Sequence, residues 1–190
     1  HRQTGETDIL VSIDLDGLGE SSIETGVPFF DHMLTLFSKH SLIDLEVSAK
    51  GDIEVDFHHT VEDTGIVLGQ CLREALGEKR GIGRYGSALL PMDETLARVA
   101  LDFSGRPFLD YRAPEQVENI GGSFAFTLVE EFLRALTFNA LMNLHVEILY
   151  GRDAHHMAEA VFKGVARAAG EALRIDPRIA DRVPSTKNVL

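Results

Sequence analysis

Two copies of one short motif carry the residue types that most directly suggest chemistry. The sequence has HHTVE at residues 58–62 and HHMAE at residues 155–159. On a helix, residues three or four apart lie on one face, so the second histidine and the glutamate of each copy are neighbours, as are the first histidine and the glutamate. Imidazole and carboxylate together suit Mn, Fe, Ni, Co or Zn. The repeated motif therefore predicts an enzyme that depends on a metal.

Each predicted metal site needs ligands from more than one element, because one helix supplies at most three. His32 lies on the preceding predicted helix of the first half of the chain, and Glu131 holds the corresponding position in the second half. Adjacent histidines diverge by about 100° around a helix, so the two in each motif can serve different ions. We expect two sites with crossed ligands, one with His32, His59, Glu62 and His155 and the other with Glu131, His156, Glu159 and His58. The sequence leaves open whether the ligands cross within one chain or between subunits.

Basic and hydroxyl residues indicate a second requirement, the recognition of a phosphate monoester. Planar guanidinium groups, an ammonium group and hydroxyls are the groups that bind phosphate in proteins. The candidates are Arg84, Arg106, Lys163 and, in the C-terminal tail, Ser185, Thr186 and Lys187. Taken singly, each basic residue is also compatible with an ordinary solvated surface charge. Lys163 is the hardest to explain in that way, since it lies four residues after a proposed ligand.

The elements that would position these residues are predicted by hydrophobic spacing. Apolar residues alternate over residues 6–15, as in a half-buried strand, and shorter strands are expected at residues 22–25, 43–47 and 53–55. Helical spacing begins after Pro28. A second run of helical spacing begins at His58 and ends before Gly77. The predicted order is strand, strand, helix, strand, strand, helix.

The second half of the chain repeats this pattern. In the second half, residues 94–105 resemble residues 6–17, a strand is predicted at residues 108–112, and the last helix is predicted at residues 154–173. Matches in one order, with offsets that change only at loops, indicate a duplicated unit. We therefore expect an α+β fold of two tandem ββαββα half-units, residues 1–85 and 86–190. Each would have an antiparallel four-stranded sheet with two helices on one face, and the halves would pack as a pseudo-dimer.

Composition narrows the functional classes. The chain has 190 residues, of which 44% are hydrophobic, enough for one sizeable core. A formal net charge of −12 argues against non-specific binding to nucleic acid. We expect no membrane span and a cytoplasmic location, because no apolar run is long enough for a membrane helix or a signal peptide. The single Cys71 leaves imidazole and carboxylate as the metal ligands.

Four segments together resemble a known family. They are FDHML (30–34), FHHTVEDTGIVLG (57–69), GRDAHHMAEAVFK (151–163) and PSTK (184–187). Over essentially the whole chain, the sequence resembles imidazoleglycerol-phosphate dehydratases of histidine biosynthesis. The resemblance implies a carbon–oxygen lyase that converts imidazole glycerol phosphate to imidazole acetol phosphate. It also implies two manganese ions per subunit and a homo-oligomer of 24 subunits, with sites between subunits.

The resemblance also assigns residues. Those that match the metal ligands of the family are His32, His58, His59, Glu62, His155, His156 and Glu159. Those that match its phosphate-binding positions are Arg84, Arg106, Lys163, Ser185 and Lys187, and we add Thr186, His32 and His40 to the substrate site. Glu6 matches a glutamate of the substrate site. The departure is Glu131, where the family carries histidine; a carboxylate can still bind manganese but adds negative charge.

This resemblance suggests a mechanism as a hypothesis. The substrate's ring would bind as imidazolate between two manganese ions, which lower its pKa and act as an electron sink. Glu6, or the Asp93 and Glu94 pair related to it by the repeat, would move the proton to or from carbon. His40 or a metal-bound water would assist departure of the hydroxyl.

Two other functions fit the same motifs. A dinuclear metallohydrolase would act on a phosphorylated small molecule and release phosphate, since paired metals activate water in many such enzymes. A non-catalytic protein would use the ions only to hold subunits together.

Overall fold

Each half of the chain forms a four-stranded sheet with two helices packed on one face. The computed structural model describes residues 1–190. The elements of the first half are β1 (Arg2–Gln3), β2 (Thr7–Asp14), β3 (Ser21–Glu24), α1 (Pro28–Ser41), β4 (Asp44–Gly51) and α2 (His58–Leu76). Those of the second half are β5 (Tyr85–Met92), β6 (Thr95–Asp102), β7 (Phe108–Arg112), α3 (Thr127–Ala140), β8 (Asn143–Tyr150) and α4 (Ala154–Leu173).

The two sheets have the same topology, which confirms the duplicated α+β fold. Their strand orders are β1-β2-β4-β3 and β5-β6-β8-β7. The last pair in each order, β4 with β3 and β8 with β7, is parallel. The other pairs are antiparallel. The predicted all-antiparallel sheet was therefore wrong in this detail. Parallel neighbours need a crossover connection, and α1 and α3 supply it.

The predicted strand at residues 53–55 is also wrong. Ile53 and Val55 lie in a turn in which the Val55 N–H donates to the carbonyl of Asp52 at 2.8 Å, and the side chain of Val55 is 68% exposed. Two alternating apolar residues are too few to specify a strand when the edge position is already filled. The fourth strand of each sheet is instead the one that begins the half, β1 or β5. Each half thus runs strand, strand, strand, helix, strand, helix.

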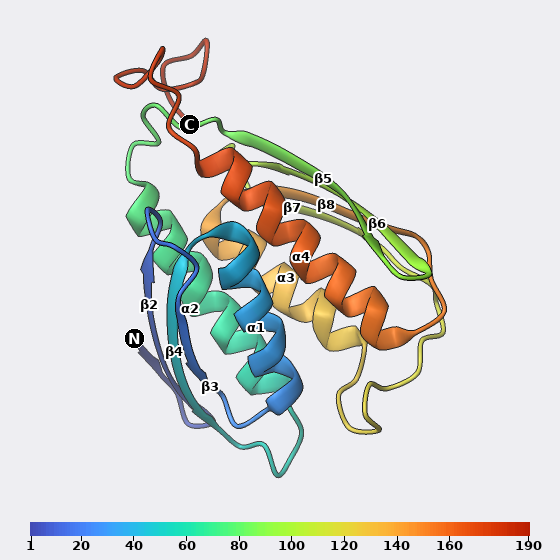
Figure 1. Ribbon diagram of the computed structural model, residues 1–190. Coiled ribbons are helices and arrows are strands. Elements are labelled where there is room, and N and C mark those ends of the chain that lie inside the picture. Colours follow the sequence, from blue (N-terminus) through green and yellow to red (C-terminus); the bar gives the residue numbers. More distant parts are fainter.

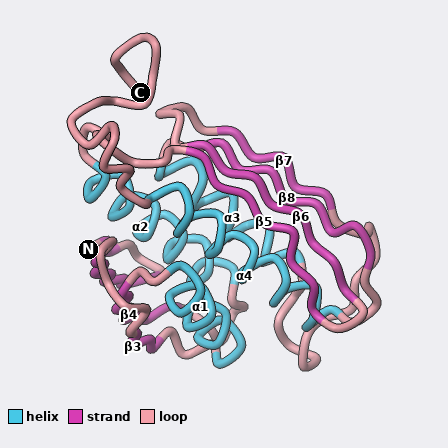
Figure 2. The backbone as a smooth tube through the Cα atoms, turned by 45° about the horizontal axis from the view of Figure 1, so that its top comes forward, coloured by secondary structure: helices cyan, strands magenta, loops and turns pink.

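The helices form a layer between the two sheets, and the halves meet through it (Figures 1 and 2). Helix α2 packs on α3, and α1 packs on α4. Three buried phenylalanines cross this layer: the Phe132 ring lies 5.3 Å from Phe30 and 5.2 Å from Phe162, centroid to centroid. Glycines bring α2 and α3 close together, since a Cβ built at Gly69 would lie 2.6 Å from the carbonyl oxygen of Leu136.

The four helices run in nearly one direction, so their N-terminal ends lie at one end of the molecule (Figure 1). The C-terminal tail after α4 lies at the opposite end. Both histidine motifs are in the first turns of α2 and α4, and His32 and Glu131 lie near the starts of α1 and α3. The fold therefore collects the predicted metal ligands at one end and the tail at the other. None of the helices has the length and apolar character needed to cross a membrane.

Candidate functional site

Three predicted ligands converge where α1 meets α4. The Nε2 atoms of His32 and His155 lie 3.0 and 2.9 Å from the same carboxylate oxygen of Glu159. This is the only group of three or more His, Cys, Asp or Glu residues whose ligand atoms all lie within 4.8 Å of one another. Phe29 packs edge-on against the His155 ring, with centroids 5.2 Å apart. The arrangement can hold one cation between two imidazoles and a carboxylate.

Glu159 is held as an anion in this cluster. Glu159 is only 7% exposed, and burial by itself would raise the pKa of its carboxyl group. Hydrogen bonds from Lys163, His32 and His155 outweigh that effect and lower the pKa of Glu159 to about 2. A buried carboxylate flanked by two imidazoles is a ligand set that manganese and related divalent ions accept. The donor chemistry therefore fits a metal of the predicted class.

The second histidine of each motif is oriented by a carboxylate. Nδ1 of His59 lies 3.0 Å from Asp52, and Nδ1 of His156 lies 2.7 Å from Glu94. These hydrogen bonds raise the pKa of both histidines. A histidine that binds a metal through one ring nitrogen commonly donates the other N–H to a carboxylate, so Nε2 of each ring remains the nitrogen available to an ion.

Asp52 is a site residue that the sequence did not reveal. It follows the last residue of β4 and lies between the strands that were predicted at residues 43–47 and 53–55. The repeat does not point to Asp52, because the residue with the same role in the second half, Glu94, comes from a different place, the turn before β6. Its position only six residues before His58 was the one available signal.

Glu6 and Asp93 occupy the other side of these histidines. Glu6 lies 3.8 Å from Nε2 of His59, and Asp93 lies 3.7 Å from Nε2 of His156. Their side chains are 58% and 75% exposed. Glu94 differs, because its hydrogen bonds with His156 and with the backbone N–H of Asp153 hold its pKa far below the usual range. Glu6 and Asp93 are thus the exposed carboxylates nearest to Nε2 of the two oriented histidines.

The predicted grouping of ligands is not the one found within a single chain. His32 was expected to share an ion with His59, Glu62 and His155. It does lie beside His155, but the carboxylate between them is Glu159, which had been assigned to the other site. The reason is that α1 packs against α4 of the other half, and α3 correspondingly packs against α2. His58 lies 3.5 Å from Glu62, and Glu131 lies 4.0 Å from Arg134. In the single chain these three residues do not form a converged cluster.

Five of the six predicted phosphate-binding residues gather at the opposite end. Arg84, Arg106, Ser185, Thr186 and Lys187 line one pocket of about 590 Å³. The guanidinium of Arg84 donates to both carboxylate oxygens of Asp102, at 2.7 and 3.1 Å, and to the carbonyl of Pro184 at 2.8 Å. It therefore anchors the tail, and its charge is matched by Asp102. Guanidinium, ammonium and hydroxyl groups in one pocket suit an anion such as phosphate.

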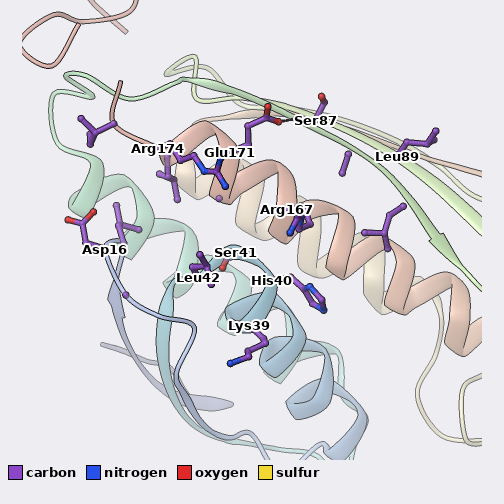
Figure 3. A pocket seen from close by; sticks show the side chains of 17 residues that line it. Asp16, Lys39, His40, Ser41, Leu42, Ser87, Leu89, Arg167, Glu171 and Arg174 are labelled. Atoms are coloured by element: carbon purple, nitrogen blue, oxygen red, sulfur yellow. Dashed lines mark hydrogen bonds between the residues drawn. The ribbon is translucent and has the colours of Figure 1, made fainter. Parts of the chain in front are cut away.

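Lys163 and His40 lie elsewhere. Lys163 contacts Glu159 in the metal-ligand cluster. His40 is half-buried in a groove of about 970 Å³ between the halves, and Figure 3 shows it near Arg167 across the groove. Burial, and then the charges of Lys163 and Arg167, lower the pKa of His40. These effects favour the neutral form of its imidazole.

The cluster of His32, His155 and Glu159 is far, within one chain, from the pocket lined by Arg84, Arg106 and the tail, which is called the phosphate pocket below for its predicted ligand. The backbone N–H of Arg84 donates to the carbonyl of Ala172 near the end of α4, whereas His155 is in its first turn. Seventeen residues of helix separate the two levels by about 25 Å. A small phosphate ester cannot reach both from one position.

Comparison with known proteins gives a consistent match. A sequence profile described as imidazoleglycerol-phosphate dehydratase matches residues 25–169. Imidazoleglycerol-phosphate dehydratases from Akkermansia muciniphila and Methylorubrum extorquens are each 58% identical over 189 residues, covering 100% of this chain and 96% of the relative. The structure of the Pyrococcus furiosus enzyme, in complex with (S)-C348, has a TM-score of 0.84 at 37% identity and covers 100% of this chain and 99% of that one. The Staphylococcus aureus enzyme has a TM-score of 0.82 at 44% identity, with 92% and 97% coverage.

Proposed function

The chain belongs to the imidazoleglycerol-phosphate dehydratase family, and from this membership we propose that it converts imidazole glycerol phosphate to imidazole acetol phosphate and water with two manganese ions per subunit. Enzymatic dehydration in histidine biosynthesis follows from the family. The proposal of this specific reaction with manganese is supported above all by one observation, the convergence of His32, His155 and Glu159 on one point. A cytoplasmic location fits a biosynthetic enzyme of this kind.

The manganese ligands proposed are His32, His58, His59, Glu62, Glu131, His155, His156 and Glu159. The first support is the donor set, imidazole with carboxylate, which manganese accepts. The second is the pair of hydrogen bonds that the carboxylates of Asp52 and Glu94 accept from the rings of His59 and His156, which fixes these rings. When bound, manganese would lower the pKa of the substrate's imidazole ring and withdraw electrons through it.

The chain's own residues would then handle the proton and the leaving hydroxyl. Glu6 and Asp93 are exposed carboxylates beside Nε2 of the oriented histidines. Either can take the proton from the second side-chain carbon, which becomes the ketone, while the hydroxyl leaves from the carbon next to the ring. Glu94 is the poorer choice, because both of its oxygens are engaged in hydrogen bonds. His40, whose pKa is lowered beside Lys163 and Arg167, would bind the ester, or in its protonated form would donate the proton with which the hydroxyl leaves as water.

We also propose that each active site is shared between subunits of a homo-oligomer, of 24 chains by analogy with the family. The support is the separation of about 25 Å between the metal end of α4 and the phosphate pocket. The metal ligands and Lys163 of one chain would face Arg84, Arg106, Ser185, Thr186 and Lys187 of another. Substrate would bridge the two chains, with its ring at the first and its phosphate at the second.

The test is an assay of manganese-loaded protein with imidazole glycerol phosphate. Formation of the ketone, with the phosphate ester intact, is expected. Release of inorganic phosphate instead would identify a metallohydrolase. Absence of turnover in protein whose metal content is complete would refute the proposed reaction.

A further inference from the structure

Lys79 is a buried ammonium group close to the phosphate pocket. The residue is only 6% exposed. Its Nζ donates to the carbonyl oxygen of Phe103 at 3.2 Å, and no carboxylate oxygen lies within 4.0 Å of it. Lysine is almost never buried to this extent without an anionic partner, because the charge loses its hydration. This position therefore needs an explanation.

The end of α2 places Lys79 there. The chain reverses after Leu76, with the Lys79 N–H donating to the Leu76 carbonyl at 2.8 Å and a left-handed φ of 58° at Lys79. A left-handed conformation is uncommon for a lysine and here turns its side chain inward. The side chain reaches the end of β6, where Asp102 binds Arg84 and where the turn that carries Arg106 begins.

The ammonium lies at the wall of the pocket. A methyl group built at Gly105 would lie 3.6 Å from Nζ of Lys79 and 2.6 Å from the backbone carbonyl carbon of Leu190. Leu190 and Arg106, the residue after Gly105, both line the pocket. Lys79 itself does not line it, so its charge would act through the wall.

The charges around the pocket show what Lys79 adds. Arg84 contributes little net charge because both oxygens of Asp102 accept hydrogen bonds from its guanidinium, one from Nε and one from a terminal nitrogen. Arg106 and Lys187 have no carboxylate partner, and Lys79 is the third cation near the pocket without one. Burial lowers the pKa of Lys79, with Asp102 opposing that effect and Arg84 adding to it. A bound dianion nearby would offset the cost of burying the ammonium.

We propose that Lys79 is a positioning residue of the phosphate pocket, whose buried positive charge strengthens binding of the substrate's phosphate through the pocket wall. The inference rests on the proposed function in taking this pocket as the phosphate site. A different role, as a hydrogen-bond tie to Phe103 alone, would need only a donor. Charge and donor can be separated by substitution.

The experiment compares Lys79→Met, Lys79→Gln and Lys79→Arg in the manganese-loaded oligomer. Binding of inorganic phosphate is measured by calorimetry over a range of salt concentrations, with KM and kcat alongside. Lys50→Met, on the exposed face of β4, is the matched control. Loss of the charge in Met and Gln should weaken phosphate binding and raise KM about tenfold. It should also reduce the salt dependence of binding, while kcat and metal content stay unchanged and Arg restores affinity.

The outcomes separate the two proposals. Phosphate binding by Lys79→Gln that equals wild type would overturn the inference, because a donor would then suffice. The same holds if Met has no effect. If Met fails to assemble, the contrast between Gln and Arg decides. Weakened phosphate binding in Gln together with a wild type that does not dehydrate the substrate would uphold the charge at Lys79 and refute the proposed reaction.

Discussion

The Glu94 carboxylate lies 2.7 Å from Nδ1 of His156 and fixes the ring of the second histidine in its motif. The first half achieves the same geometry with Asp52, from a different strand end. Glu6, the repeat counterpart of Glu94, is left on the Nε2 side of His59. The duplication has thus kept the orientation of the histidine while changing the residue that provides it.

Removal of the orienting carboxylate should weaken metal binding. Asp52→Leu deletes the acceptor for the His59 N–H. Loss of such a partner typically lowers metal affinity, and we expect a decrease of about 10- to 100-fold for this variant. Asp52→Asn keeps one oxygen acceptor and should retain most of the affinity. Manganese titration of both variants tests this, with Glu46→Leu on the exposed face of β4 as the control. Equal affinities for Asn and Leu would contradict an orienting role.

Metal content should follow the two motifs separately. His59→Ala and His156→Ala should each reduce bound manganese by about half per subunit, because each removes one imidazole ligand from one site. Elemental analysis of dialysed protein measures this directly. Unchanged stoichiometry in both variants would refute the two-site assignment.

The phosphate pocket should respond differently to its two kinds of cation. Lys187→Ala should raise KM while metal content stays constant, because it removes only a phosphate contact. Arg84→Ala also leaves the largely buried Asp102 without a partner and frees the carbonyl of Pro184. We expect a loss of folding stability on the order of 3 kcal/mol. Thermal melts of both variants give the comparison, and an equally stable Arg84→Ala would show that Asp102 finds another partner.

Mixed oligomers should reveal a shared active site. His155→Ala disables the metal end of a chain, and Lys187→Ala weakens its phosphate end, so activity is compared at a substrate concentration well below the raised KM. When the two variants are unfolded together and refolded in equal amounts, about a quarter of the sites in a symmetric assembly should combine two intact halves. Activity should rise above that of either variant alone. If the site lies within one chain, mixing will recover nothing.

The glycine contact between α2 and α3 should control stability. Gly69→Ala in an exposed helix would be worth up to about 1 kcal/mol of stabilisation. Here the new Cβ would meet the Leu136 carbonyl oxygen at 2.6 Å and the Asn139 Cβ at 2.8 Å. Overpacking should instead cost about 1–3 kcal/mol. A lowered melting temperature for Gly69→Ala, with Gly5→Ala as a control in open space, is the expected result.

Much of the fold could be predicted because local signals and the final structure agree. The limits of α2 and α4 follow from hydrophobic spacing and from Gly77, and β7 coincides with the predicted residues 108–112. The repeat revealed the two halves, since both copies of the metal motif kept their residues. These features depend on residues close together in the chain.

The errors concern contacts between distant residues. Spacing along the chain says that His32 precedes one motif, but the packing of α1 on α4 decides which motif it joins. Asp52 and Lys79 gain their roles only from the three-dimensional fold, one beside His59 and the other beside Phe103. Ile53 and Val55 looked like a strand because alternation alone does not show that β1 already pairs with β2.

Helix α4 carries metal ligands in its first turn and, about 25 Å away, supports the phosphate pocket beside its last turn. In the proposed assembly, the length of this helix sets the distance between one active site and the next. Its length is then under a constraint unrelated to the stability of the single chain. An added turn would leave every site residue intact and shift successive sites by about 5.4 Å, enough to stop the assembly from closing.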